Sequence, residues 1–199
     1  MYRIFGDVNS GNCYKVKLLA TQLGVPFEWV NVDILQQETR SAGFLRMNPN
    51  GKIPLLEMPD GRYLAESNAI LHFLAEDTPL LPDDRYERAK VLQWLFFEQY
   101  SHEPYIATAR YIVRYLGLPA EREAEFQSKQ APGNRALDVM EEHLRHEPFF
   151  VGNRYTIADI ALFAYTHVAE EGGFSLKAYP CIQQWLGRVA LQPRFIKLG

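Results

Sequence analysis

The sequence is poor in cysteine: its 199 residues include only Cys13 and Cys181, which lie far apart. Two such cysteines form neither a disulfide framework nor a zinc-binding pattern. The chain also lacks any apolar run near the ~20 residues that a membrane-spanning helix needs. Its first residues show no basic leader followed by an apolar run and a small-residue cleavage site. We therefore expect a soluble, cytoplasmic protein that does not enter a membrane.

An excess of one charge is missing too. Lys and Arg number 21 and Asp and Glu number 24, which gives a net charge of -3. This balance of charges does not indicate binding to nucleic acid, which needs an excess of basic groups. What the sequence does contain is 47% apolar residues, enough to bury the core of one large domain or two small ones.

The first 77 residues alternate between strand-like and helix-like pieces. A β-rich run at residues 2–6, a helical pattern at 12–24 that Gly24 ends, and a strand at 27–34 make a β-α-β unit, which implies parallel pairing. Two apolar pieces then flank Asp60-Gly61, a strong hairpin signal. Residues 67–77 follow as a helix with Ser67 at or near its N-cap. The pattern predicts a small α/β domain with helices on the faces of its sheet.

The chain changes character near residue 78. Residues 78–86 contain prolines and a cluster of acidic groups, which suits a linker. Residues 87–199 then read as an all-helical domain, with a long pattern at 87–116 that we expect to bend at Pro104 and further helices at about 120–146, 156–170 and 180–191. Thr156 and Asp159 resemble a capping box, which we interpret as structural.

The most informative stretch is residues 44–67. Pro54 stands at the start of a strand, where it cannot donate to a ladder, and a cis Ile53–Pro54 bond would leave the backbone N–H and C=O of Ile53 to pair with an extended peptide. Glu66 and Ser67 stand where a helix begins, and a helix N-terminus binds a carboxylate well. The Ser67 hydroxyl adds a donor, and Glu66 suits an ammonium group. Together these features predict a site for a small peptide with an α-amino acid head.

On these motifs the chain resembles the soluble glutathione transferases, with "NPNGKIP" before the proline, "ES" at the third helix and "TIADI" in the helical domain. The resemblance implies a thioredoxin-like first domain with a mixed four-stranded sheet, a helical second domain, and a homodimer. It implies glutathione as a co-substrate, with no cofactor. Pro54 is then the cis-proline, Ile53 pairs with the cysteinyl unit, Glu66 and Ser67 hold the γ-glutamyl head, and Lys52 lies near the tripeptide.

One position departs from the family pattern. Theta-like members often carry a histidine or another basic group before the second helix, whereas this chain has Thr39, flanked by Gln37 and Arg40. Thr39 is the resulting candidate for contact with the glycyl end of glutathione.

Candidates for the chemical step lie in "DVNSGNCYKVKLL", residues 7–19. A free thiol has a pKa of ~8.5 and is only slightly ionised at neutral pH, so a donor at the helix N-terminus would help by stabilising the thiolate. Ser10 has the position of the serine in theta-like transferases. Ser10, Asn12 and Lys15 also resemble the nu-class "T-x-N-x-x-K" pattern, whose members favour disulfide reduction. Cys13 is the rival, as a nucleophile that forms a mixed disulfide, and we favour Ser10.

Each of these residues also has a purely structural interpretation. Ser10 caps the helix, Asn12 stabilises a turn, and Lys15 is a solvated charge. In the helical domain, aromatic and polar side chains around Pro104 form a candidate wall of the electrophile site. We expect about half of these side chains to be buried in the core, away from any ligand. The wall comprises Tyr105, Arg110 and Tyr111 as the candidate ligand contacts, with Tyr100, His102 and Tyr115 beside them.

Two histidines have the spacing of metal ligands but lack a third ligand. His143 and His146 are flanked by Glu142 and Glu147, but no third ligand is in sight, so we interpret them as part of an exposed charged helix and expect no metal.

The leading hypothesis is a glutathione transferase of the detoxification type, which stabilises the thiolate for attack on a small hydrophobic electrophile. The alternatives are a glutathione-dependent disulfide or peroxide reductase, and a non-catalytic ligand-binding or interaction module with the same fold.

Overall fold

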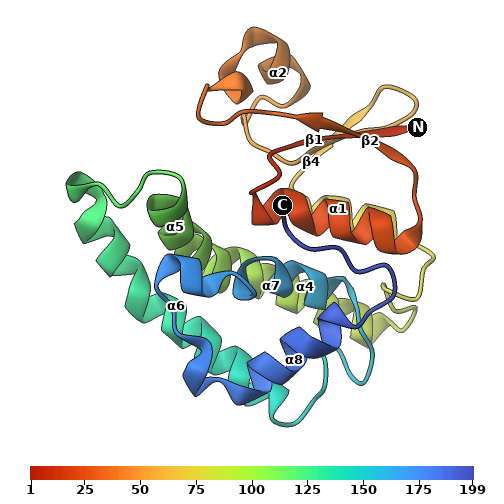
Figure 1. The fold of residues 1–199 in the computed structure, drawn as a ribbon. Coiled ribbons are helices and arrows are strands. Elements are labelled where there is room, and N and C mark those ends of the chain that lie inside the picture. The colour runs from red at the N-terminus through yellow and green to blue at the C-terminus, as the bar shows by residue number, and fades with distance from the viewer. The chain divides into compact units, whose positions relative to one another are not determined.

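The computed structural model describes residues 1–199 and divides them into two compact units (Figure 1). The first unit contains Met1–Thr78 together with Pro193–Gly199, and the second contains Pro79–Gln192. The last residues of the chain thus group with the first unit, which no sequence pattern indicated. None of the helices has the length and apolar character needed to span a membrane.

A mixed four-stranded sheet forms the centre of the first unit, as predicted. Its strands are β1 (Tyr2–Gly6), β2 (Phe27–Asn31), β3 (Leu55–Glu57) and β4 (Tyr63–Ala65), in the order β2-β1-β3-β4. The β1–β2 pair is parallel, and the β1–β3 and β3–β4 pairs are antiparallel. Asp60-Gly61 lies in the β3–β4 turn, where Gly61 adopts a φ of 85° that suits glycine.

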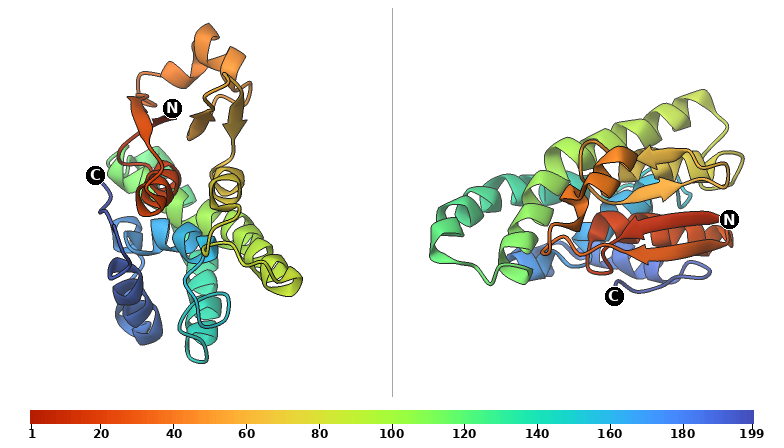
Figure 2. Two further views of the ribbon diagram at one scale, coloured as in Figure 1. Left: turned by 90° about the vertical axis from the view of Figure 1, so that its right-hand side faces the viewer. Right: turned by 90° about the horizontal axis from the view of Figure 1, so that it is seen from above.

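Helices cover both faces of this sheet. Helices α1 (Gly11–Leu23) and α3 (Ser67–Ala75) lie side by side on one face, and the short α2 (Ala42–Met47) lies on the other (Figures 1 and 2). Phe44 of α2 packs with Phe5, Val32 and Leu55 in the core of that second face. Gly24, in the left-handed conformation, ends α1 as predicted.

The second unit is entirely helical. Its α-helices are α4 (Arg85–Phe97), α5 (Glu103–Arg114), α6 (Glu123–Leu144), α7 (Ile157–Thr166) and α8 (Pro180–Ala190). Helix α5 packs against α6, α4 against α7, and α8 against both α6 and α7. All residues of α7 are buried, which makes it the central helix of this unit.

The break in the long helical pattern lies just before Pro104 rather than at it. Residues 98–102 form a π-helical turn, and α5 begins at Glu103 with Pro104 in its first turn. The first turn of a helix needs no backbone N–H from its residues, so proline fits there. The predicted interruption is confirmed, and its form is a π turn followed by a new helix start.

The capping box at α7 is confirmed and extends beyond a cap. The Asp159 carboxylate accepts hydrogen bonds from the backbone N–H of Thr156 (2.9 Å) and of Phe150 (3.1 Å) and from the indole Nε1 of Trp185 (2.9 Å). Burial raises the pKa of Asp159 to about 6, although these hydrogen bonds lower it. The residue therefore connects the loop before α7, α7 itself and α8.

The two histidines of α6 have different surroundings. His146 is exposed and lies 3.4 Å from Glu142, as expected for a charged helix face. That expectation is wrong for His143, which is half-buried, stacks on the ring of Phe150 and bonds through Nε2 to the carbonyl of Phe149. Burial lowers the pKa of His143. No group of three or more His, Cys, Asp or Glu side chains is arranged to hold a metal ion.

Candidate functional site

The N-terminus of α1 presents the Ser10 hydroxyl. Ser10 is the N-cap residue, and its Oγ accepts a hydrogen bond from the backbone N–H of Cys13 at 3.4 Å. A turn before the helix holds it: the Asp7 carboxylate accepts from the N–H of Asn9 (2.8 Å), and the Asp7 carbonyl accepts from the N–H of Ser10 (3.1 Å). The first turn of α1 carries no acidic residue, so this helix end attracts an anion.

Cys13 faces the interior of the first unit. Its side chain is 0% exposed, and a Cβ placed on Gly6 of β1 would lie only 2.9 Å from its Sγ. Burial raises the pKa of the Cys13 thiol to about 12, while hydrogen bonds with the Ser10 side chain and the Asp7 backbone lower it. A protonated, inward-facing thiol is a poor nucleophile. This environment favours Ser10 over Cys13.

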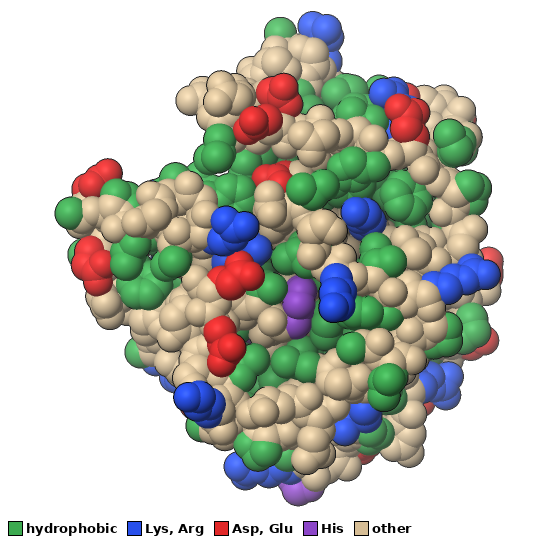
Figure 3. All heavy atoms as spheres, in the orientation of Figure 1, with side chains coloured by type: hydrophobic (Ala, Val, Ile, Leu, Met, Phe, Trp, Pro, Cys, Tyr) green, Lys and Arg blue, Asp and Glu red, His purple; other side chains and the backbone are tan.

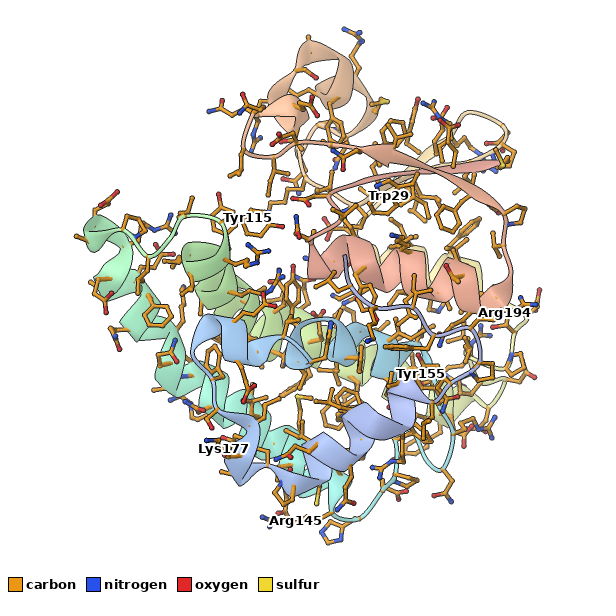
Figure 4. The ribbon with its side chains drawn as sticks, viewed as in Figure 1. Trp29, Tyr115, Arg145, Tyr155, Lys177 and Arg194 are labelled. Atoms are coloured by element: carbon orange, nitrogen blue, oxygen red, sulfur yellow. The ribbon has the colours of Figure 1, made fainter.

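Gly6 allows this close packing, and sequence reasoning missed it. A Cβ at Gly6 would also lie 2.8 Å from Cη2 of Trp29, whose ring packs beneath the sheet (Figure 4). The Lys17 ammonium lies 5.3 Å from the centre of the same ring. The only sequence signal was a glycine at the end of a β-rich run, which by itself does not reveal a close approach.

A chain of hydrogen bonds joins the N-termini of α1 and α3. Lys15 is 0% exposed, and its Nζ donates to Oγ of Ser67 at 3.4 Å. Ser67 Oγ in turn donates to Oδ1 of Asn12 at 3.3 Å. The interpretation of Lys15 as a solvated charge is therefore wrong, because α3 covers this face of α1. Asn12 does more than stabilise a turn, since its side chain bonds to the neighbouring helix.

The proline loop and the start of α3 complete the site. The Ile53–Pro54 peptide bond is cis, as predicted, and Pro54 is buried directly before β3. Glu66 is the exposed N-cap of α3 and has a φ of 69°, so Ser67 is the first helical residue. Left-handed backbone at a non-glycine residue costs on the order of 1–3 kcal/mol and concentrates at functional sites. These residues place backbone donors and a carboxylate side by side at a helix N-terminus.

The loops before and after α2 (Ala42–Met47) expose cations, whereas Thr39 is buried. Thr39 lies in a 3-10 turn (Glu38–Arg40) and is only 7% exposed. Arg40 is exposed, with Nη1 3.4 Å from the carbonyl of Asn50. Lys52 is also exposed, and its carbonyl accepts from Nδ2 of Asn48 at 2.8 Å. Arg40 is not among the site residues predicted from the sequence, although it directly follows Thr39.

The aromatic wall of the second unit divides into buried and accessible members. His102 is fully buried and bonds through Nε2 to Oγ1 of Thr166 (2.9 Å). Arg110 is also buried, and its Nε donates to Glu171 at 2.8 Å. The rings of Tyr111 and Tyr115 lie 5.2 Å apart, with Tyr115 directly after α5 (Figure 4). The partly accessible members are Tyr105, Tyr111 and Tyr115, and Tyr100 is exposed.

These features define a class of protein. A sheet of order β2-β1-β3-β4, a cis-prolyl bond before β3, and two adjoining helix N-termini form a thioredoxin-like unit, and an all-helical unit is joined to it. The glutathione S-transferase N-terminal domain model matches residues 9–77, and the glutathione S-transferase C-terminal domain model matches residues 91–193. The chain belongs to the glutathione S-transferase family.

Solved structures of this family superpose closely on the chain. A glutathione S-transferase from Pseudomonas fluorescens Pf-5 is 56% identical, with a TM-score of 0.97 over 99% of this chain and 98% of that one. Another family member from the same strain, solved with two glutathione molecules bound, is 27% identical, with a TM-score of 0.83 over 97% of this chain and 89% of its own.

Curated relatives are more distant and differ in name. The disulfide-bond oxidoreductase YfcG of Escherichia coli is 29% identical over 189 residues, which cover 92% of this chain and 87% of that protein. The elongation factor 1-gamma of Artemia salina is 29% identical over 177 residues, which cover 86% of this chain but only 40% of that protein.

Proposed function

We propose that the protein is a glutathione transferase in which Ser10, assisted by Asn12, stabilises the thiolate of glutathione. The observation that carries this proposal is the Ser10 hydroxyl at the N-cap of α1, next to a buried and protonated Cys13. The thiolate attacks a small hydrophobic electrophile, forms a bond from sulfur to carbon and displaces the leaving group. An oriented hydroxyl and the helix dipole both lower the pKa of a thiol held beside them.

Glutathione would lie extended along the cis-prolyl loop. The backbone of Ile53 pairs with the cysteinyl unit, the Glu66 carboxylate holds the α-ammonium, and the N–H groups at the start of α3 hold the γ-glutamyl carboxylate. The exposed Arg40 and Lys52 are better suited than the buried Thr39 to the glycyl carboxylate. The family member solved with two glutathione molecules supports glutathione as the ligand.

The electrophile would contact the helical unit. Tyr105 and Tyr111 are partly accessible and offer ring faces and hydroxyl groups to a small apolar ligand. Arg110 is buried and paired with Glu171, so in this proposal it stabilises the helical unit and does not contact the electrophile.

We also propose a cytoplasmic homodimer with a role in detoxification. Helix α4 exposes apolar side chains on one face at Ala89, Leu92 and Phe96, and Phe96 is 62% exposed. Such a stripe is typical of a helix that packs against a partner, and a two-fold dimer is the commonest assembly. On the face shown in Figure 3, charged groups of both signs are interspersed. Analytical ultracentrifugation tests the dimer, and a monomer at micromolar concentration would contradict it.

The Ser10→Ala variant tests the transferase proposal. We expect kcat/KM with an aryl halide to fall by about 10- to 100-fold while glutathione still binds, because one oriented donor to the thiolate is lost. Ser41→Ala is the matched control, since Ser41 caps α2 and its Oγ accepts from the N–H of Phe44 at 3.2 Å. That variant loses a similar cap but should keep its turnover. Unchanged turnover in Ser10→Ala would remove Ser10 from the role.

A second candidate activity is glutathione-dependent reduction of disulfides. It is favoured by the pattern of Ser10, Asn12 and Lys15 and by the similarity to a relative named as a disulfide-bond oxidoreductase. In this reaction two glutathione thiols are oxidised to glutathione disulfide, and the substrate disulfide is reduced to two thiols. Rates on a model disulfide and on an aryl halide, measured with the same preparation, distinguish the two activities. Tight glutathione binding with no turnover of either substrate would instead favour a ligand-binding module.

A further inference from the structure

Arg110 of α5 is a buried cation that needs a fixed partner. Its side chain is only 4% exposed, and a guanidinium group keeps its charge in proteins. A buried charge is costly unless a counter-charge and hydrogen bonds compensate for it. Nε of Arg110 donates to Oε2 of Glu171 at 2.8 Å, a distance typical of a charge-assisted hydrogen bond. The position of Arg110 is therefore tied to that of Glu171.

Glu171 belongs to the 3-10 turn η4 (Ala169–Gly172), which packs directly on α5. A Cβ at Gly172 would lie 2.9 Å from the backbone N of Arg110, so a glycine at this position allows the two backbones to approach closely. The Gly172 carbonyl also accepts from Nε2 of Gln130 in α6 at 3.1 Å. The turn is thus held by both α5 and α6, and the Glu171 carboxylate has a defined place beside Arg110.

The same carboxylate also lies near a second arginine, one helical turn further along α5. Oε2 of Glu171 is 4.0 Å from Nε of Arg114, whose side chain is 58% exposed. An exposed ion pair at this distance contributes little. The buried contact with Arg110 is therefore the one that fixes the last turn of α5.

The accessible side of that last turn carries a tyrosine that pairs with a second one. Consecutive residues of an α-helix point about 100° apart, so Tyr111 is partly accessible although Arg110 beside it is buried. The Tyr111 ring lies 5.2 Å from the ring of Tyr115, with an angle of 31° between their planes. Figure 4 shows Tyr115 at the end of α5. Because Tyr111 directly follows Arg110, a displacement of this turn moves the tyrosine pair as well.

We propose that Glu171 is a positioning residue for aromatic electrophiles. By holding Arg110, it fixes the Tyr111–Tyr115 pair in the place where the ring of an electrophile packs. Glu171 itself does not contact the electrophile. The inference rests on the proposed transferase function and adds a specificity to it. Conjugation of an electrophile with a ring depends on Glu171, whereas conjugation of an electrophile without a ring does not.

Glu171→Gln and Glu171→Asp, made in the full chain, test this role. The first keeps the length of the side chain and removes its charge, and the second keeps the charge and shortens the side chain. With an aryl halide, both should lower kcat/KM about tenfold, mainly by raising KM, because a small displacement of a positioning group has a large effect. With iodomethane, which has no ring, kcat/KM should stay within about twofold. The affinity for glutathione, measured by titration calorimetry, should also stay within about twofold.

Glu170→Gln is the matched control, because Glu170 is the exposed neighbour of Glu171 in the same turn. It should leave the kinetics with both electrophiles unchanged. Urea unfolding shows whether each variant is folded under the conditions of the assay. If Glu171→Gln is not folded, because its change removes a counter-charge of Arg110, Glu171→Asp carries the test alone.

Three results would overturn the inference by itself. The first is an unchanged kcat/KM with the aryl halide in a folded Glu171 variant. The second is an equal loss with the aryl halide and with iodomethane, which indicates a general effect on the enzyme. The third is an unmodified protein that conjugates iodomethane but no aryl halide. A different result would overturn the proposed function, and this inference with it: the unmodified protein conjugates neither electrophile to glutathione.

Discussion

Cys13 should be chemically inert, because burial keeps its thiol protonated at neutral pH. With the pKa of the thiol raised to about 12, the thiolate fraction at pH 7 is about one in 10⁵. A free thiol with a pKa of ~8.5 is ionised to a few per cent at the same pH. The difference predicts alkylation on the order of 10³-fold slower than for free glutathione, before lack of access slows it further.

Timed alkylation followed by peptide mass spectrometry measures this rate. The native protein is treated with iodoacetamide, and the partly exposed Cys181 serves as the internal comparison. We expect modification of Cys181 only, and modification of both cysteines after unfolding in urea. The Cys13→Ala variant should also keep its turnover within about threefold, because we propose that Ser10 carries the catalytic role. Rapid labelling of native Cys13, or a mixed disulfide between Cys13 and glutathione, would refute the reasoning and restore Cys13 as the nucleophile.

Two further predictions concern stability. Asp159 has a pKa of about 6 in the folded protein against 3.8 in the unfolded chain, so the folded state holds more protons between these values and the contribution of Asp159 to stability falls as the pH rises. Urea titrations measure the difference in unfolding free energy between the unmodified protein and Asp159→Asn. This difference should fall by roughly 3 kcal/mol between about pH 4 and pH 7. A difference that does not change with pH would contradict the prediction. Gly6→Ala should cost about 1–3 kcal/mol, because its Cβ would meet Trp29 and Cys13 at under 3.0 Å. A Cβ at Gly187 would meet no atom within 4 Å, so Gly187→Ala should be neutral or stabilising in the same urea assay.

Features that depend on local chemistry were predictable from the sequence. The hairpin at Asp60-Gly61, the helix stop at Gly24, and the capping box of Thr156 and Asp159 each need only a few neighbouring residues. The cis bond at Pro54 was predictable because a proline at the start of a strand conflicts with ladder pairing. Such signals lie within the segment that they describe.

Features that depend on packing between distant segments were not predictable. Lys15 and Ser67 are 52 positions apart, and only the contact of α1 with α3 turns an apparent surface charge into a buried donor. The inward direction of Cys13 likewise depends on Gly6 and Trp29, from two different strands. His143 was misjudged for the same reason, since its ring partner, Phe150, lies beyond the end of its helix.

Residues 193–199 belong to the first unit, and this limits how the chain can be cut or recombined. The Tyr14 hydroxyl donates to the carbonyl of Ile196 at 2.7 Å, so the tail is bonded to the helix that carries Ser10. The helical unit is thus an insertion within the first unit, and the chain crosses between the units twice. A fragment cut after residue 78 would lose the hydrogen bond from Tyr14 to the Ile196 carbonyl. A chimera that exchanges helical units must preserve both junctions. A circular permutant that joins the tail directly to residue 1 would keep the first unit in one continuous stretch.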